Sequence, residues 1–464
     1  MRLRSSQEAE YKLGSIQEAL PPDGLRTSYH ERLNSASRTK RYNPAMRIVV
    51  SFLLNLCLAL TAMAETPPSS ATVPITLDHN RIIVDVRLPL PDGDTKRVRA
   101  WVDNGNPELW IAESAAKAMG LDLSGEQKEE FGLKVLTTKP PKQFTLGGLQ
   151  IDLGGVKEAK IVMGRSVIFS GLSAAMNLPA PVLRNYDVVI DYPNREFTLA
   201  QRGSLHHKGE AVKALLNSEN SLLQIPSQID GQKFNLGFDV GASFSFLGTT
   251  IIDSLRKKHA AWPRMTGATG EANLWGIPDE PKWTLLRIPV MQYGSVSLKQ
   301  VGVASYAKEF LDWFEKRAGV PTMGLIGGNA FLAYRIGIDY ANSTVYFDHS
   351  GRDPIPAMDV VGLVLRPAAD ERYTIIGVAD LGGKPSVTDV KAGDVLLSVD
   401  KVPATGGTMG QVWSLLGGRP GEGRTLVLER EGKQITVKAT VRRFLGAAPA
   451  AGSGEKSKSS STRK

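Results

Sequence analysis

Hydrophobic and polar residues alternate in short runs over most of this 464-residue chain, and a period of two is typical of β-strands. Two stretches follow one longer pattern: an apolar strand, Asp-x-Gly, about four residues, a second apolar strand and an amphipathic helical run. They read VRAWVDNGNPELWIAESAAKAMG (residues 98–120) and FNLGFDVGASFSFLGTTIIDSLRKK (residues 234–258). The pattern predicts a mainly β protein with one short helix in each half.

A second pair of similar segments indicates an internal duplication. These segments are VVIDYPNREFTLA and IGIDYANSTVYFD, and each reads as strand, Asp-Tyr turn, strand. Their aspartates, Asp191 and Asp339, are 148 positions apart (339 − 191), so a partner for Asp103 is expected roughly that far downstream, where Asp239 occupies a matching context. A tight Asn-Gly hairpin would explain the first copy alone, but it leaves the second copy unexplained.

The first 64 residues contain a segment typical of an export signal. Met46 begins a mostly apolar run that ends in Ala-Met-Ala, the small-x-small pattern that signal peptidase cleaves. Residues 1–45 are polar and lack periodicity, so we expect a mis-assigned start or a disordered segment there, followed by a signal peptide over residues 46–64. This predicts a periplasmic or secreted protein. The alternative is an anchor in the inner membrane through an uncleaved signal, for which the apolar run is short.

The single cysteine, the histidines and the charge distribution exclude several classes of chemistry. Cys57 lies inside the apolar run, so no thiol or disulfide remains once that segment is removed. His206 and His207 have no second ligand pair at metal spacing, and GGRPGEGR lacks the GK[ST] of a phosphate loop. The formal net charge of +9 is concentrated in the two tails, which leaves no basic stripe for nucleic acid. We therefore expect no metal, no cofactor and no nucleic-acid partner.

Around Asp239 the chain resembles the aspartic peptidases of the retropepsin and pepsin type, in particular the bacterial retropepsin-like proteins with a C-terminal PDZ domain. The family signature is an apolar strand ending in DTG or DSG, then a hydrophobic-hydrophobic-glycine element before a helix. The second half supplies FDVGAS for the first part and GLIGGNAF, Gly324 to Phe331, for the second. The resemblance covers roughly residues 74–347. It implies a mainly β fold of two acid-protease-like β barrels, followed by a PDZ domain.

The domain organisation that follows from this resemblance has six parts. The last of them is rich in Ala, Gly, Ser and Lys and has too few apolar residues to fold. The expected parts are a mis-assigned or disordered start (1–45), the signal peptide (46–64), lobe 1 (65–202), lobe 2 (203–352), the PDZ domain (357–445) and a disordered basic tail (446–464).

The resemblance makes Asp103 and Asp239 the catalytic pair. Peptide hydrolysis without metal or thiol can use a water held between two carboxyls, one ionised as general base and one protonated as general acid. Adjacent carboxyls share one proton because two charges so close together repel strongly. Gly105 and Gly241 would let each loop turn back with its amides near the carboxylate. The expected partner is a peptide or protein substrate.

The chain departs from the family at residues that support this pair. Asn104 and Val240 stand where the family usually has a hydroxyl that braces one loop against the other. Asn104 can hydrogen bond across the axis, whereas Val240 has no polar side-chain atom. In the second half Ala242 and Ser243 follow the glycine, and the Ser243 hydroxyl could support the Asp239 carboxylate. In the first half Asn106 and Pro107 follow the glycine, and proline has no N–H group to donate. The first half also has SGLSAAMNLPAPVLRNY in place of GLIGG, so this element looks degraded.

These departures leave three interpretations open. The chain is an active endopeptidase, or it is a catalytically inactive peptide-binding protein on the same fold. In the third interpretation two chains pair through Asp239, as single-lobed retropepsins do. The duplication favours a monomer with an internal pseudo-twofold axis, and a homodimer is the alternative.

One segment of the second half has the position of a flap over the cleft. MTGATGEANLWG (residues 265–276) has the glycines of such a hairpin, and Trp275 and Trp283 could line the cleft. An ordinary surface hairpin is the alternative for the segment, and core packing is the alternative for the tryptophans.

From about Ala357 the pattern changes, and AGDVLLSVDKVPA is the part that most resembles a bacterial PDZ domain. Such domains bind an extended peptide as an added strand and hold its terminal carboxylate with loop amides. The resemblance implies peptide binding by five residues, three in the loop and two on the helix: Val361, Gly362, Leu363, Val412 and Leu416. The alternative is a module that packs on the peptidase lobes and binds no ligand.

Overall fold

The computed structural model describes residues 68–130, 132–267, 280–306, 308–351 and 358–449. The expected start segment, the signal peptide and residues 450–464 of the expected tail lie outside these ranges, and so does most of the expected flap. Within these ranges, no helix has the length and apolar character needed to cross a bilayer.

The described part of the chain is mainly β, with 47% of its residues in strands and 13% in helices, which confirms the fold class at this level. One part is a closed six-stranded barrel. It closes because the first strand of the series also pairs with the last, with Ser227 opposite Tyr293. In spatial order its strands are β16 (Leu223–Ile229), β17 (Gln232–Phe238), β22 (Gly324–Ile326), β18 (Ser245–Gly248), β21 (Val296–Tyr306) and β20 (Thr284–Tyr293). Two short strands extend this sheet: β15 (Leu215–Leu216) and β19 (Arg264–Thr266).

The first half of the chain forms a ten-stranded sheet with a matching core arrangement. Here β11 lies between β4 and β5, parallel to the first and antiparallel to the second, and β10 is parallel to β5. In the barrel, β22 lies in the same way between β17 and β18, and β21 is parallel to β18. In spatial order the strands are β6 (Gln127–Glu130), β7 (Leu133–Thr138), β10 (Ala159–Val162), β5 (Leu109–Ala112), β11 (Met176–Pro179), β4 (Thr95–Asp103), β3 (Arg81–Pro89), β8 (Thr145–Leu146) and β9 (Leu149–Gln150), with β2 (Thr76–Asp78) beside β3.

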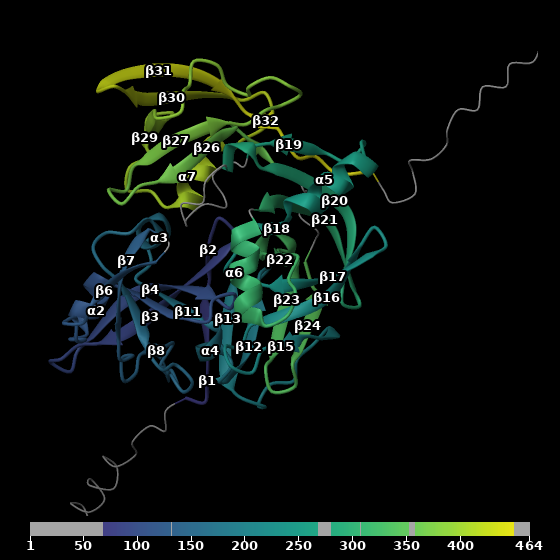
Figure 1. Cartoon of the computed structure of the whole chain (residues 1–464). Helices are drawn as coiled ribbons and strands as arrows, with labels where there is room; N and C mark the ends of the chain where they lie inside the picture. Colours follow the sequence, from purple (N-terminus) through teal and green to yellow (C-terminus); the bar gives the residue numbers. More distant parts are fainter. Residues whose placement is uncertain (1–67, 131, 268–279, 307, 352–357, 450–464) are drawn as a thin grey trace, which may run out of the picture. The chain divides into compact units, whose positions relative to one another are not determined.

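A six-stranded sheet joins the two halves (Figure 1). At its centre β12 and β23 pair in antiparallel fashion, and Val189 lies opposite Gly337. These two residues are again 148 positions apart (337 − 189), so equivalent residues of the repeat face each other and a local twofold axis passes between them. The strands, in order, are β1 (Ser70–Pro74), β13 (Glu196–Gln201), β12 (Tyr186–Asp191), β23 (Tyr334–Asp339), β24 (Thr344–His349) and β14 (Glu210–Lys213).

Short helices connect these strands. In each half a helix follows the strand after Asp-x-Gly, as the pattern predicts. In the second half this helix buries Ile251, Ile252 and Leu255 on one face, the spacing expected of an amphipathic helix. The described helices of the two halves are α2 (Glu113–Ala118), α3 (Val167–Leu172), α4 (Ala180–Leu183), α5 (Thr249–Lys258), α6 (Lys308–Ala318) and the 3₁₀ turns η1 (Glu280–Lys282) and η2 (Gly328–Ala330).

The described residues of the C-terminal module, 358–449, form a six-stranded sheet, a two-stranded sheet of β25 and β32, and one helix. α7 (Met409–Leu416) begins with a capping box between Thr408 and Gln411, which satisfies first-turn amides. The disordered tail was predicted to begin at residue 446, which is too early. Ala448 is buried, and its main chain hydrogen bonds the side chain of Gln300. The strands are β25 (Asp359–Val360), β26 (Leu363–Pro367), β27 (Tyr373–Val378), β28 (Val395–Val399), β29 (Val402–Pro403), β30 (Gly423–Arg430), β31 (Lys433–Thr440) and β32 (Arg442–Arg443).

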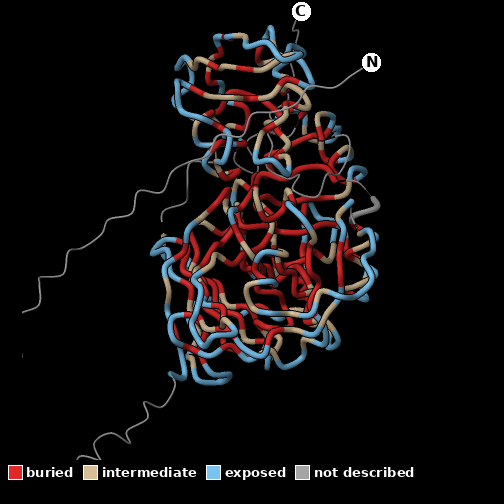
Figure 2. The backbone as a smooth tube through the Cα atoms, turned by 90° about the vertical axis from the view of Figure 1, so that its left-hand side faces the viewer, coloured by how far each residue is buried: buried red, intermediate tan, exposed pale blue. Residues whose placement is uncertain are grey.

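The buried residues follow the strands and the exposed ones gather at the turns (Figure 2). The largest apolar cluster runs through the sheets of both halves without interruption. Both Asp-x-Gly segments follow strands of this cluster, so their backbones are anchored on buried residues such as Val102 and Phe238.

We expect Gly324→Ala to destabilise the barrel by about 1 to 3 kcal/mol, as overpacking does in a dense core. A Cβ at this position would overlap the main-chain oxygen of Phe246 in the neighbouring strand. That oxygen cannot move without shifting the strand to which it belongs. Gly423→Ala is the matched control, because a Cβ there meets no atom within 4 Å. Thermal unfolding of both variants measures the difference, and equal stabilities would contradict the described barrel packing.

Candidate functional site

The two Asp-x-Gly segments meet inside one chain. A Cβ on Gly105 would overlap the carboxyl group of Asp239, and a Cβ on Gly241 would overlap that of Asp103. Each glycine therefore lies against the carboxyl of the opposite half, at a distance that no larger residue permits. The structure brings the two expected catalytic residues together, along with the glycines expected to shape their loops.

Asn104 braces the two loops from one side. Its Nδ2 donates to the main-chain oxygen of Phe238 at 2.9 Å, and its Oδ1 accepts from the main-chain N–H of Val240 at 2.8 Å. Asn104 is fully buried, so these bonds are shielded from water. A side-chain amide can donate and accept at once, which lets one residue bond both main-chain groups that flank Asp239. Val240 is buried and apolar, so its side chain makes no reciprocal bond, as the sequence predicts.

Trp101 adds a third hydrogen bond between the halves. Its Nε1 donates to the main-chain oxygen of Gly241 at 3.1 Å. The residue lies on β4, two positions before Asp103, where the alternation of the strand directs it to the same side as the carboxyl group. The sequence analysis did not identify Trp101 as a site residue.

The two carboxyl groups are supported differently. Oδ1 of Asp239 accepts the main-chain N–H groups of Gly241 at 2.8 Å and Ala242 at 3.1 Å. Asp103 instead hydrogen bonds the side chains of Asn106 and Asn177. Side-chain amides thus take the place of the main-chain donors in the first half. Asn177 was missed by the sequence analysis, and its signal was a single amide within the buried run MNLP.

Both carboxyls are buried, with Asp103 3% exposed and Asp239 8% exposed. Burial raises the pKa of Asp239 to about 6, because the charged form loses its hydration. Burial, and secondly the charge of Asp239, raise the pKa of Asp103 well above its ordinary value. Main-chain N–H groups stabilise the charge on Asp239, so the ionised form is favoured on Asp239 over Asp103.

A buried arginine lies close enough to act on both groups. Arg81 begins β3 and is 4% exposed. Its positive charge lowers the pKa of Asp103 and of Asp239, against the larger effect of burial. The residue follows a turn in which His79 and Asn80 both have positive φ. Sequence reasoning missed Arg81, although a charged residue directly before the apolar run IIV was a visible signal.

Ser243 is buried beside the Asp239 loop. Its main-chain oxygen accepts Nδ2 of Asn80 at 3.1 Å, which links the turn before β3 to this loop. Support of the carboxylate by the Ser243 hydroxyl stays a prediction.

The strand and the main-chain hydrogen bond of the hydrophobic-hydrophobic-glycine element are present in both halves. In the second half, GLI forms β22, and the N–H of Gly328 donates to Ala242 at 2.8 Å. In the first half, β11 occupies the same place, and the N–H of Ala180 donates to Asn106 at 3.0 Å. The expectation that this element is degraded in the first half is therefore wrong for the backbone, since other residues build the same strand and the same hydrogen bond.

The five residues expected to bind a peptide in the C-terminal module lie together at one end of α7, but they are closed to solvent. Val361, Leu363, Val412 and Leu416 are each at most 1% exposed. The N–H of Val361 donates to Leu416, and that of Leu363 donates to Val361. The carbonyl of Gly362 accepts from Ala379. The loop in this state does not present the amides of Val361 and Leu363 to a carboxylate.

The remaining expected site features lie outside the pair. Trp275 and residues 268–279 are not among the described residues. Trp283 is buried and packs with Phe246 and Tyr306, so core packing accounts for it. His207 stacks on Tyr346. In the described ranges, no group of three His, Cys, Asp or Glu residues is arranged to hold a metal ion.

We expect Asn104→Ala to lower the free energy of unfolding by about 2 to 4 kcal/mol, because it leaves a buried N–H and a buried carbonyl without partners. Asn104→Thr should keep more of this stability, since a hydroxyl can both donate and accept. Denaturant unfolding of the two variants and the parent measures their free energies of unfolding and so tests this order of stability. Equal losses for Ala and Thr would contradict a bracing role through hydrogen bonds.

These observations on the molecule itself carry the functional argument, because no protein family model matches the chain and no curated protein matches its sequence significantly.

Proposed function

We propose that this protein is an exported aspartic endopeptidase that hydrolyses peptide bonds with the pair Asp103 and Asp239. One observation carries the proposal. Two buried carboxyls from equivalent strand ends are held side by side, with each loop glycine packed on the opposite carboxyl. Two carboxyls with a shared proton form an acid and a base at one point, and peptide hydrolysis by an activated water can use that combination without a metal.

The roles within the pair follow from their different support. Asp239 is the general base: it is ionised above pH about 6, and two main-chain N–H groups hold its charge. It takes a proton from a water molecule as that water attacks the scissile carbonyl carbon. Asp103 holds the proton and donates it to the carbonyl oxygen. The rigid placement of both groups by Asn104 and Trp101 supports catalysis because misplacement by even 1 Å is costly.

The fold supports the same proposal. We infer two acid-protease-like lobes, residues 65–202 and 203–352, followed by a PDZ domain that starts near residue 357. The strand pairings around β4, β5, β10 and β11 recur around β17, β18, β21 and β22, and equivalent strands meet at a local twofold axis. Export through the segment 46–64 is part of the proposal.

A peptide-binding protein without hydrolytic activity is the second candidate. The specific observation in its favour is the unequal support of the two carboxyls, since Asp103 depends on Asn106 and Asn177 rather than on main-chain N–H groups. The hydrogen bonds of Asn104 favour the active form, because they hold the Asp239 loop in place from across the axis.

We expect the purified protein to cleave a denatured protein substrate, and we expect Asp239→Asn and Asp103→Asn each to lower the rate by on the order of 10² to 10⁴-fold. Asparagine has the same shape but cannot exchange the proton. Asp85→Asn is the control, because this partly exposed carboxylate pairs with Arg97 and makes none of the contacts described for the pair. Equal cleavage by the parent and by Asp239→Asn would end the peptidase proposal and leave the peptide-binding one.

The cleavage rate should fall as the pH drops below about 6. The pKa of Asp239 is raised to about 6, so acidification protonates the base and removes the ionised form that activates water. The rate should also fall on the alkaline side as Asp103 loses its proton, and this limb should lie at higher pH than an isolated carboxyl would give, because burial and the charge of Asp239 raise the pKa of Asp103. A profile of the rate from pH 4 to 9 measures both limbs, and a maximum near pH 3 would contradict the assigned protonation states.

A further inference from the structure

The groove of the C-terminal module already holds a segment of the same chain. In a PDZ domain a peptide lies between the strand after the carboxylate loop and the helix, which here are β26 and α7. The helix α3 of the first half packs against both of them. Figure 1 shows α3 next to α7, below the strands of the module. The place of a bound peptide is thus taken by a helix of the first half.

The contact between α3 and the groove is apolar and closed. Ile168, Phe169 and Leu172 of α3 are each at most 5% exposed. They belong to one buried cluster with groove residues of the module, among them Leu365 and Val412. Burial of three large apolar side chains on this scale is worth several kcal/mol, so the groove and α3 hold each other in place.

A second contact joins the module to the turn that precedes Arg81. Oδ1 of Asp78 accepts the N–H of Gly410 in the first turn of α7 at 2.9 Å, and a helix N-terminus favours a carboxylate there. The ring of His79 lies 4.7 Å from that of Trp413. The next residue, Asn80, bonds the Asp239 loop. Three successive residues therefore lead from α7 to the carboxyl pair.

A third contact joins the module to the second half. The N–H of Asp380 donates to the carbonyl of Thr266 in β19 at 2.9 Å. Phe244, which follows the Asp239 loop, belongs to a buried cluster that includes Val360 and Phe444 of the module. The module is thus held by both halves, on elements that adjoin the two Asp loops.

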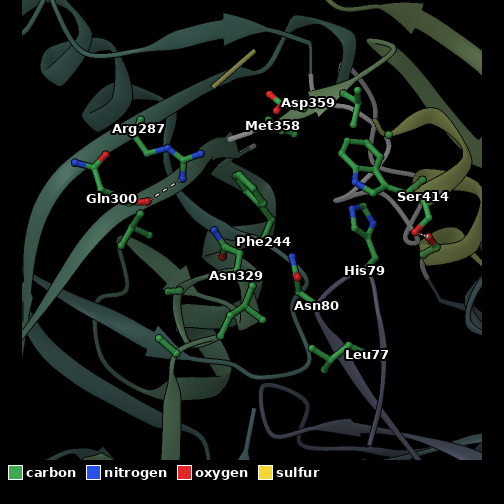
Figure 3. Close-up of a pocket in the computed structure, with 18 of the residues that line it drawn as sticks. Leu77, His79, Asn80, Phe244, Arg287, Gln300, Asn329, Met358, Asp359 and Ser414 are labelled. Carbon is green, nitrogen blue, oxygen red and sulfur yellow. Dashed lines mark hydrogen bonds between the residues drawn. The ribbon is translucent and has the colours of Figure 1, made fainter. Parts of the chain in front are cut away.

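The junction also contains a cavity that is partly open to solvent, which distinguishes it from a continuous core. A cavity of about 810 Å³ lies between the turn before β3, the barrel and the module. Figure 3 shows His79 and Asn80 on one side of this cavity, with Arg287 and Phe244 on the other. Interfaces between domains of one chain resemble transient complexes, and a cavity of this size leaves part of this interface unpacked.

We propose that the groove between β26 and α7 is an intramolecular docking surface for α3, and that the docked C-terminal module is a cap that shields the two Asp loops. Undocking frees the groove and exposes the loops in one movement. The docking itself does not depend on the proposed peptidase activity; its effect on hydrolysis rests on that proposed function.

Docking is tested by hydrogen exchange on the full chain. Phe169→Ala removes the aromatic ring that α3 contributes to the cluster, and we expect amides of β26 and α7 to exchange at least tenfold faster. Phe144→Ala is the matched control, because Phe144 is equally buried in the first half but belongs to the other cluster. Unchanged exchange in β26 and α7 for Phe169→Ala, or the same increase for both variants, would overturn the docking.

The cap is tested by locking the module with a reversible crosslink. Thr266 and Asp380 pair across an antiparallel bridge, where a disulfide can form. In a Cys57→Ser background, the double variant Thr266→Cys, Asp380→Cys should exchange the amides of Gly241 and Ala242 at least tenfold more slowly when oxidised than when reduced. Each single cysteine variant is the control and should not respond to reductant.

Hydrolysis by the same locked protein separates the two proposals. We expect cleavage to be at least tenfold slower in the oxidised form and to recover on reduction. Equal exchange in both redox forms, or measurable cleavage at equal rates in both, overturns the cap. If exchange differs as expected and no form of the protein cleaves any substrate, the peptidase proposal fails and the docked cap stands.

Discussion

The close contact of two glycines with two carboxyl groups is the constraint on which the rest of the site depends. Gly105 and Gly241 leave room for the opposite carboxyl only because they have no Cβ. Once the loops cross at this distance, both carboxyls are buried next to each other. Their pKa values rise chiefly because burial removes the hydration of the charged forms, and for Asp103 also because of the charge of Asp239. The chemistry we propose is a consequence of this packing rather than of any unusual residue.

The surrounding structure supports the crossing unequally. One buried amide, Asn104, makes the hydrogen bonds to the main chain on both sides of Asp239. In the other direction the equivalent side chain is a valine, and the second half contributes main-chain carbonyls, that of Gly241 to Trp101 and that of Ser243 to Asn80. The first half therefore supplies the bracing side chains. Asp239 has main-chain donors and Asp103 side-chain donors, and this difference is the basis of the acid and base roles that we propose.

The C-terminal module contacts the elements that form the site; it does not merely follow them in the sequence. Its apolar groove, its helix N-terminus and its last residues each contact one of the two halves. The residues that contact both α7 and the Asp239 loop, Asp78 to Asn80, are consecutive in the chain, so the proposed undocking would reach this loop through a short path. Such a path can couple two sites only if the junction has two arrangements, and the partly open cavity is compatible with a second one.

The sequence by itself determined the β class and the internal duplication, because alternation and repetition are local patterns. The pairing of Asp103 with Asp239 was implied by the resemblance to aspartic peptidases. The sequence also identified the unequal residues Asn104 and Val240. It did not reveal Trp101, Asn177 or Arg81, since each of them reaches the pair from a strand whose place is set by distant pairings. The sequence also suggested that the hydrophobic-hydrophobic-glycine element is degraded in the first half. The strand MNLP nevertheless forms the same backbone structure without the expected glycines. Only the tertiary structure decided that α3 fills the groove of the C-terminal module, since that contact joins segments about 200 positions apart whose apolar faces have no sequence signal for each other.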